Sequence, residues 1–254
     1  MQLDFVIATA REAGAAILKI YEREFKIETK ADSSPLTEAD LAAHEIITRK
    51  LREEFPDIPV LSEESSDGAS YEVRKHWERY WLVDPLDGTK EFIKRNGQFT
   101  VNIALIENNR PAAGVVYAPV KGWMYTGSVG AGAFKVEGSG DPVALQCPRV
   151  PTSGTLRVVG SLSHSSPEME SFIQDQQKKY DDVQFIAMGS SLKICLVAEG
   201  AADIYPRFGP TMEWDIAAAH AVIRAAGGSL TAHDSKEELP YNKENLLNGW
   251  FVAS

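Results

Sequence analysis

Residues 82–92 read LVDPLDGTKEF, a short apolar run followed by two carboxylates. Asp84 and Asp87 stand at the end of an expected strand, and Gly88 allows a tight turn into a helix that we expect to begin near Thr89. Magnesium prefers oxygen ligands, and this segment offers both carboxylates and a backbone carbonyl between them. The spacing excludes an EF-hand loop. A magnesium site is therefore one interpretation, and a turn capped by the Asp side chains is the other.

Two more acidic positions lie at the ends of predicted elements. Glu63 and Glu64 come shortly after the apolar run IPVL, which predicts a strand. If that strand packs beside the one ending at Asp84, it places Glu63 next to Asp84. Asp215 opens an alanine-rich helix, WDIAAAHAVIRAAGG. Taken singly, the Glu pair is typical of a solvated loop and Asp215 of a helix cap.

The rest of the chain predicts a mixed α/β protein. Apolar residues spaced three and four apart predict one helix near the start, and Thr37 opens a second. β-Branched and aromatic residues broken by Asn, Pro and Gly over residues 99–136 predict an antiparallel meander. The proline-containing segment 141–154 is the expected internal boundary, after which strands and helices alternate. We therefore expect an N-terminal α+β half over residues 1–150 and a C-terminal α/β half over residues 151–254.

The composition is that of a soluble globular protein of 254 residues, 44% hydrophobic and 24% charged. A net charge of −10 has the wrong sign for binding a nucleic acid polymer, although bound cations would allow a small phosphate ester to bind. The two cysteines form no disulfide framework and no metal-ligand pair. No apolar run is long enough to span a bilayer, so we expect a cytoplasmic protein whose attachment to a membrane, if any, is peripheral. The oligomeric state stays open.

Two of these motifs, LVDPLDGTKEF and WDIAAAHAVIRAAGG, resemble signatures of the inositol monophosphatase superfamily. The resemblance extends through SPLTEAD, VLSEE, GSSLKICLVAEG and YPRFGP, and it covers essentially the whole chain. It implies a layered α/β/α/β/α sandwich. The segments KEFIKRNGQFTVNIALIE, GSSLK and YPRFGP are most similar to the bacterial 3′(2′),5′-bisphosphate nucleotidases. That similarity implies hydrolysis of 3′-phosphoadenosine 5′-phosphate to AMP and phosphate, a role in sulfur metabolism, and inhibition by lithium.

The resemblance also implies which residues bind magnesium. The ligands of one ion would be Glu63, Asp84 and the carbonyl of Leu86. The ligands of a second ion would be Asp84, Asp87 and Asp215. Glu64 is a candidate for the outer shell or for a third ion. Four carboxylates in one place would repel one another without cations, so metal binding should also stabilise the folded chain.

The expected catalytic residues are Asp40, Thr89 and Glu63. Thr89 paired with Asp40 resembles the dyad that positions the attacking water in this superfamily. The alternative for Asp40 is structural, because its spacing from Thr37 is that of a helix capping box. The sequence alone leaves both roles open for Asp40.

A bisphosphate leaves one phosphate away from the metal site, and that phosphate needs a basic partner. We expect Ser190 and Lys193, at a predicted helix start, and Arg207, at a strand end, to bind it. His164 is a candidate for contacting the base. The remaining expected substrate contacts are Glu63, Leu86, Asp87, Gly88, Thr89 and Asp215. Taken singly, Lys193 and Arg207 are typical of solvated or ion-paired surface charges.

Three alternatives to the nucleotidase differ in what they require. An inositol monophosphatase would share every metal ligand and differ in the substrate pocket. A fructose bisphosphatase-like activity fits the segments less well. A non-catalytic, metal-binding regulatory module would be expected if Thr89 or a shared ligand were missing, and all of them are present.

Overall fold

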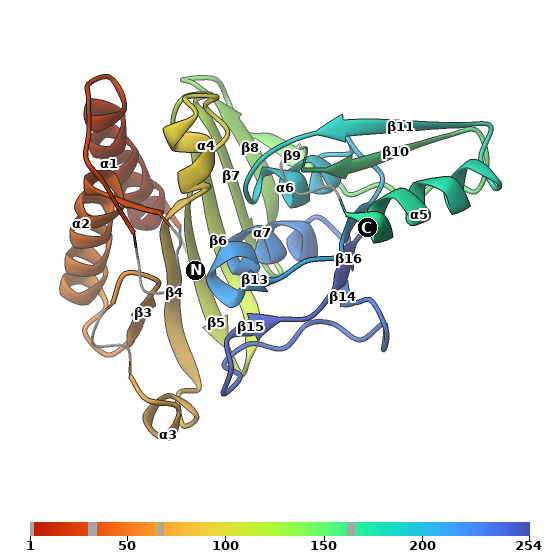
Figure 1. Ribbon diagram of the computed structural model, residues 1–254. Coiled ribbons are helices and arrows are strands. Elements are labelled where there is room, and N and C mark those ends of the chain that lie inside the picture. The colour runs from red at the N-terminus through yellow and green to blue at the C-terminus, as the bar shows by residue number, and fades with distance from the viewer. Residues whose placement is uncertain (1–2, 30–34, 66–68, 162–165) are drawn as a thin grey trace.

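The computed structural model describes residues 3–29, 35–65, 69–161 and 166–254. The elements form five layers, in the order helices, sheet, helices, sheet, helix (Figure 1). The main helices are α1 (Asp4–Tyr21) and α2 (Glu38–Glu54) in the first layer, α6 (Leu192–Ala198) and α7 (Glu213–Ala225) in the third, and α5 (Pro167–Gln177) in the last. This is the predicted α/β/α/β/α sandwich.

The first sheet has seven strands in chain order. They are β3 (Val60–Ser62), β4 (Arg79–Asp87), β5 (Thr100–Glu107), β6 (Arg110–Ala118), β7 (Trp123–Ser128), β8 (Gly132–Glu137) and β9 (Val143–Leu145). Strands β3 and β4 run parallel, and every later neighbour is antiparallel. The predicted meander is therefore confirmed.

The second sheet is built from short strands of the C-terminal part. Strand β10 (Thr155–Gly160) runs parallel to β11 (Asp182–Ala187), and β12 (Tyr205–Arg207) pairs with β16 (Phe251–Ala253), which pairs with β14 (Leu230–Ala232). A parallel bridge between Val158 and Ile204 joins the two groups. The smaller elements are β1 (Ile27–Thr29), β2 (Pro35–Thr37), α3 (Tyr71–Arg74), α4 (Thr89–Ile93), β13 (Thr211–Met212) and β15 (Leu247–Asn248).

Both N-terminal helices follow from local sequence rules. The periodic apolar residues of α1 are buried, and α1 and α2 cover one face of the first sheet. Thr37 is the N-cap of α2, and a reciprocal capping box joins it to Asp40. No helix within the described residues is long and apolar enough to cross a membrane.

Strand β4 does not stop at Asp84, as the apolar run had suggested, but continues to Asp87. Asp84 pairs with Asn102 and Asp87 pairs with Thr100, so β4 carries one extra residue against β5. In a regular strand, side chains three residues apart point to opposite faces. The extra residue is a β-bulge, and it breaks this alternation between Asp84 and Asp87.

Helix α7 lies unusually close to the first sheet because two glycines face it. A Cβ on Gly114 would come within 2.3 Å of the Ala218 carbonyl oxygen, and one on Gly127 within 2.5 Å of the Val222 Cα. The residues that α7 buries join one hydrophobic core with strand residues such as Leu82. The division of the chain at residue 150 stays a prediction, and this core draws residues from both sides of it.

Candidate active site

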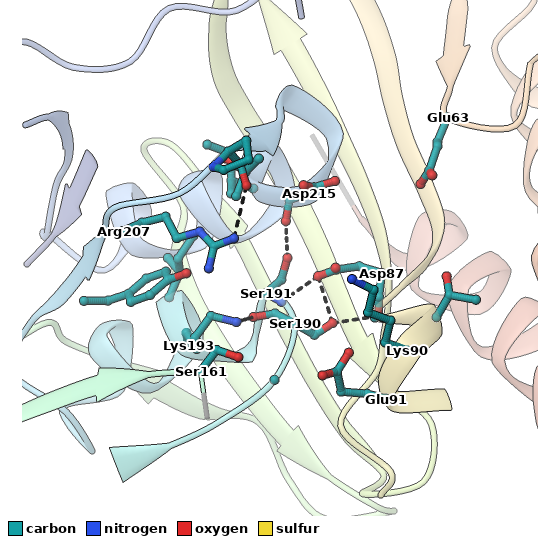
Figure 2. Close-up of a pocket in the computed structure, with 18 of the residues that line it drawn as sticks. Glu63, Asp87, Lys90, Glu91, Ser161, Ser190, Ser191, Lys193, Arg207 and Asp215 are labelled. Carbon is teal, nitrogen blue, oxygen red and sulfur yellow. Dashed lines mark hydrogen bonds between the residues drawn. The ribbon is translucent and has the colours of Figure 1, made fainter. Parts of the chain in front are cut away.

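A cavity of about 280 Å³ lies between the bulge of β4, the start of α6 and the start of α7 (Figure 2). Most of the predicted site residues line it: Glu63, Asp87, Gly88, Thr89, Ser190, Lys193, Arg207 and Asp215. Asp40, Asp84 and Leu86 are buried outside its lining. His164 lies outside the described residues. The structure thus brings together residues that the sequence distributes over most of its length.

The acidic side of the cavity is electrostatically unfavourable without a cation. Asp84 is 1% exposed, and its Oδ1 accepts a hydrogen bond of 3.0 Å from the Leu86 amide. Burial raises the pKa of Asp84 well above its ordinary value, and the charges of Glu63, Asp87 and Asp215 raise it further. Burial and the charge of Asp87 likewise raise the pKa of Asp215. Divalent cations would remove this repulsion, so the donor set fits magnesium.

The carboxylates do not form a closed cage. Within the described parts of the chain, no three His, Cys, Asp or Glu side chains are arranged to hold a metal ion. Two of the carboxylates instead accept hydrogen bonds from the protein: Asp87 Oδ2 accepts from the Ser190 hydroxyl at 2.8 Å and the Ser191 amide at 2.7 Å, and Asp215 Oδ2 accepts from the Met212 amide at 2.8 Å. The Leu86 carbonyl accepts from the Thr89 hydroxyl at 3.4 Å. The individual ligand assignments therefore stay predictions.

Asp40 closes the capping box with one carboxylate oxygen and contacts Thr89 with the other, and its catalytic role stays a prediction. Its Oδ2 accepts from the Thr37 amide at 2.8 Å and from the Thr37 hydroxyl at 2.6 Å, which completes the capping box. Its Oδ1 accepts from the Thr89 hydroxyl at 3.2 Å. Capping fixes the carboxylate, and the second oxygen holds Thr89, which lines the cavity.

The opposite side of the cavity is cationic (Figure 2). Lys193 is only 7% exposed, and its Nζ donates to the Ser190 carbonyl at 2.7 Å. Burial lowers the pKa of Lys193 to about 8. Arg207 donates to the Pro210 carbonyl at 3.1 Å. Neither cation forms an ion pair with an acid among the residues that the structure describes, and Lys193 is too buried to be a solvated surface charge.

Several lining residues were not predicted from the sequence. Tyr205 is buried beneath the cationic wall, with its ring centroid 5.5 Å from Lys193 Nζ. Ser161, Glu91 and Ser191 also line the cavity. One feature of the sequence could have indicated that Tyr205 lines the cavity, namely its position two residues before Arg207. Ser190, predicted as a substrate contact, lines the cavity but gives its hydroxyl hydrogen to Asp87.

Known proteins share both the sequence and the fold. The inositol monophosphatase family matches residues 2–250. The 3′(2′),5′-bisphosphate nucleotidase CysQ of Escherichia coli K12 is 50% identical over 99% of both chains, and CysQ of Haemophilus influenzae is 38% identical over 98% of this chain and 91% of its own. The crystal structure of CysQ from Bacteroides thetaiotaomicron superimposes with a TM-score of 0.86 at 48% identity, covering 100% of this chain and 97% of that one. This chain belongs to the inositol monophosphatase family.

Proposed function

We propose that this protein is a magnesium-dependent 3′(2′),5′-bisphosphate nucleotidase that converts 3′-phosphoadenosine 5′-phosphate to AMP and phosphate. The observation that carries the proposal is a single cavity with an acidic wall and a cationic wall that faces it. The relatives at 50% and 48% identity are both CysQ proteins, and the first is named as this nucleotidase. A substrate with two phosphates matches a site with two kinds of anion-binding group.

The acidic wall would hold the metal. Glu63, Asp84 and the Leu86 carbonyl would bind one magnesium ion, and Asp84, Asp87 and Asp215 a second. Bound magnesium supplies charge neutralisation and an acidified water, which phosphate monoester hydrolysis needs because the phosphoryl group repels its nucleophile. Glu64 keeps its place as a candidate for a third ion.

Thr89 and Asp40 would handle the proton of the attacking water. The Thr89 hydroxyl donates to Asp40 Oδ1, so the lone pairs of its oxygen are available to accept from a water in the cavity. Because the capping box fixes Asp40, the direction of the Thr89 hydroxyl is fixed as well. Such positioning lowers the barrier without any change in the metal ligands.

Lys193 and Arg207 would bind the phosphate that is not cleaved. Both line the cavity, and neither forms an ion pair with an acid within the described residues. Charge-assisted bonds from such donors are roughly twice as strong as neutral ones. An inositol monophosphate has no second phosphate to meet them, which favours the nucleotidase over the inositol-specific alternative.

The proposal predicts which phosphate is lost. Purified protein with magnesium should convert 3′-phosphoadenosine 5′-phosphate to AMP with one equivalent of phosphate, measured by anion-exchange chromatography and a phosphate assay. Asp84→Asn should be inactive, because a neutral amide would bind a divalent cation far more weakly than the carboxylate would. Formation of adenosine 3′-phosphate would mean that the 5′-phosphate, not the 3′-phosphate, is cleaved at the acidic wall. Near-normal turnover by a folded Asp84→Asn protein would contradict the two-metal site.

A further inference from the structure

Three groups from different parts of the fold form a hydrogen-bonded chain behind the cavity. Asn102, on β5, donates from Nδ2 to the Ser191 hydroxyl oxygen at 2.9 Å. Ser191, the N-cap of α6, donates from its hydroxyl to the backbone carbonyl of Asp215 in α7. The Asn102 amide also approaches that carbonyl, at 3.5 Å. The chain joins the first sheet to both helices of the middle layer.

The chemistry of the three groups decides which of them donates each hydrogen bond. The Asp215 carbonyl can only accept, so Ser191 must give it the one hydroxyl hydrogen. The Ser191 oxygen must then accept from Asn102, whose amide nitrogen is a pure donor. Asn102 is 1% exposed and Ser191 is 3% exposed, so water does not compete for these bonds. Loss of any member leaves a buried polar group unpaired.

Ser191 also contacts Asp87, a predicted ligand of the second magnesium ion. Its backbone amide donates to Asp87 Oδ2 at 2.7 Å, and Ser190 donates to the same oxygen at 2.8 Å. Figure 2 shows Ser191 between Asp87 and Asp215, with one hydrogen bond to each. One residue therefore joins the Asp87 carboxylate, on the β4 bulge, to the backbone of Asp215 in α7.

We infer that Asn102 and Ser191 are positioning residues that set the separation of Asp87 and Asp215, and hence the affinity of the site for magnesium. The inference rests on the proposed metal site but not on the identity of the phosphate ester. Groups that orient metal ligands typically contribute 10–100-fold in metal affinity. A purely structural role would instead lower the stability of the fold and leave magnesium binding unchanged.

The test compares magnesium binding by isothermal titration calorimetry, without substrate, in folded variants. Ser191→Ala and Asn102→Ala should each raise the magnesium dissociation constant about 10–100-fold. The double variant should be little worse than either single one, because the two residues act in one chain. Ser191→Thr keeps the hydroxyl and should stay within about threefold of the wild type.

Thr9→Val is the matched control. Thr9 is fully buried and donates its hydroxyl to the Phe5 carbonyl at 2.9 Å, in α1 and outside the cavity lining. Thr9→Val removes a buried bond from a hydroxyl to a backbone carbonyl far from the cavity, so its magnesium affinity should stay unchanged. Unchanged affinity in both alanine variants, or an equal loss in Thr9→Val, overturns the inference. Normal magnesium binding without turnover of the nucleotide would overturn the proposed function and leave this inference standing.

Discussion

Replacing Thr89 with valine separates the capping role of Asp40 from the catalytic role that we propose for it. The substitution keeps the shape of the side chain and removes only a hydroxyl whose bonds, to Asp40 at 3.2 Å and to the Leu86 carbonyl at 3.4 Å, are long. Removing such a bond costs about 1 kcal/mol or less, which is about 2–4 °C in melting temperature for a chain of this size. The loss of water positioning should lower kcat about 10²–10⁴-fold with little change in KM.

Asp40→Asn should lower stability as well as kcat, unlike Thr89→Val, which should mainly lower kcat. The neutral amide weakens the bond from Thr89 and also the two bonds from Thr37, at 2.8 and 2.6 Å, that close the capping box. It should therefore lose kcat as Thr89→Val does, and in addition lose about 0.5–2 kcal/mol of stability. The matched comparison isolates capping from catalysis.

The assay is steady-state phosphate release at saturating magnesium, with thermal unfolding followed by circular dichroism on the same samples. The double variant should turn over little more slowly than either single variant, because the two side chains act as one unit. Independent, multiplicative losses in kcat would refute the dyad. So would a Thr89→Val protein that keeps wild-type kcat and only binds substrate more weakly.

The other predictions concern the metal, the cationic wall and the packing of α7. Magnesium at 100 times its dissociation constant should stabilise the wild type by about 2.7 kcal/mol, which raises its melting temperature by about 5–11 °C. Without magnesium, Asp84→Asn should melt at a higher temperature than the wild type, and added magnesium should not change its melting temperature. A melting temperature below that of the wild type would contradict the repulsion described for Asp84. Lys193→Ala should raise KM for the bisphosphate about 10–100-fold. Because the pKa of Lys193 is about 8, the wild-type KM should rise as the pH increases through that value, whereas the KM of the variant should not. Parallel pH profiles would exclude Lys193 as a ligand of the second phosphate. Gly114→Ala should lower the free energy of unfolding, measured by chemical denaturation, by about 1–3 kcal/mol because the added Cβ meets the α7 backbone. Gly249→Ala should leave it unchanged because open space surrounds Gly249. Equal effects of the two substitutions would refute the close approach of α7 to Gly114. Lithium should inhibit phosphate release, and an indifferent enzyme would speak against a metal site of this family's kind.

Local sequence rules predicted most of the elements, but they could not predict how the strands pair. The periodicity of α1 and the capping box of α2 depend on residues three and four apart, which a sequence displays directly. The bulge between Asp84 and Asp87 depends on pairing with β5, so no local pattern marks it. The approach of α7 to Gly114 is likewise a contact between distant segments, and it is this contact that carries Asp215 toward the site.

The candidate site shows the same division. The acids were predicted because their residue types and motifs are distinctive, but their present hydrogen bonds to Ser190, Ser191 and Met212 were not. Lysine is usually exposed, so the burial of Lys193 could be learned only from the packing around it. Asn102 lies in an apolar strand and carries no motif of its own, and only the three-dimensional arrangement shows what it contacts.

The proposed function requires that one wall of the cavity bind metal and that the facing wall bind a second phosphate. The most direct measurement is kcat/KM with magnesium for 3′-phosphoadenosine 5′-phosphate and for inositol 1-phosphate, in the wild type and in Lys193→Ala. We predict a preference of about 10²-fold or more for the nucleotide, most of which Lys193→Ala removes while hydrolysis of the monophosphate is little affected. Equal or better hydrolysis of inositol 1-phosphate by the wild type, or proportional losses on both substrates in the variant, would contradict it.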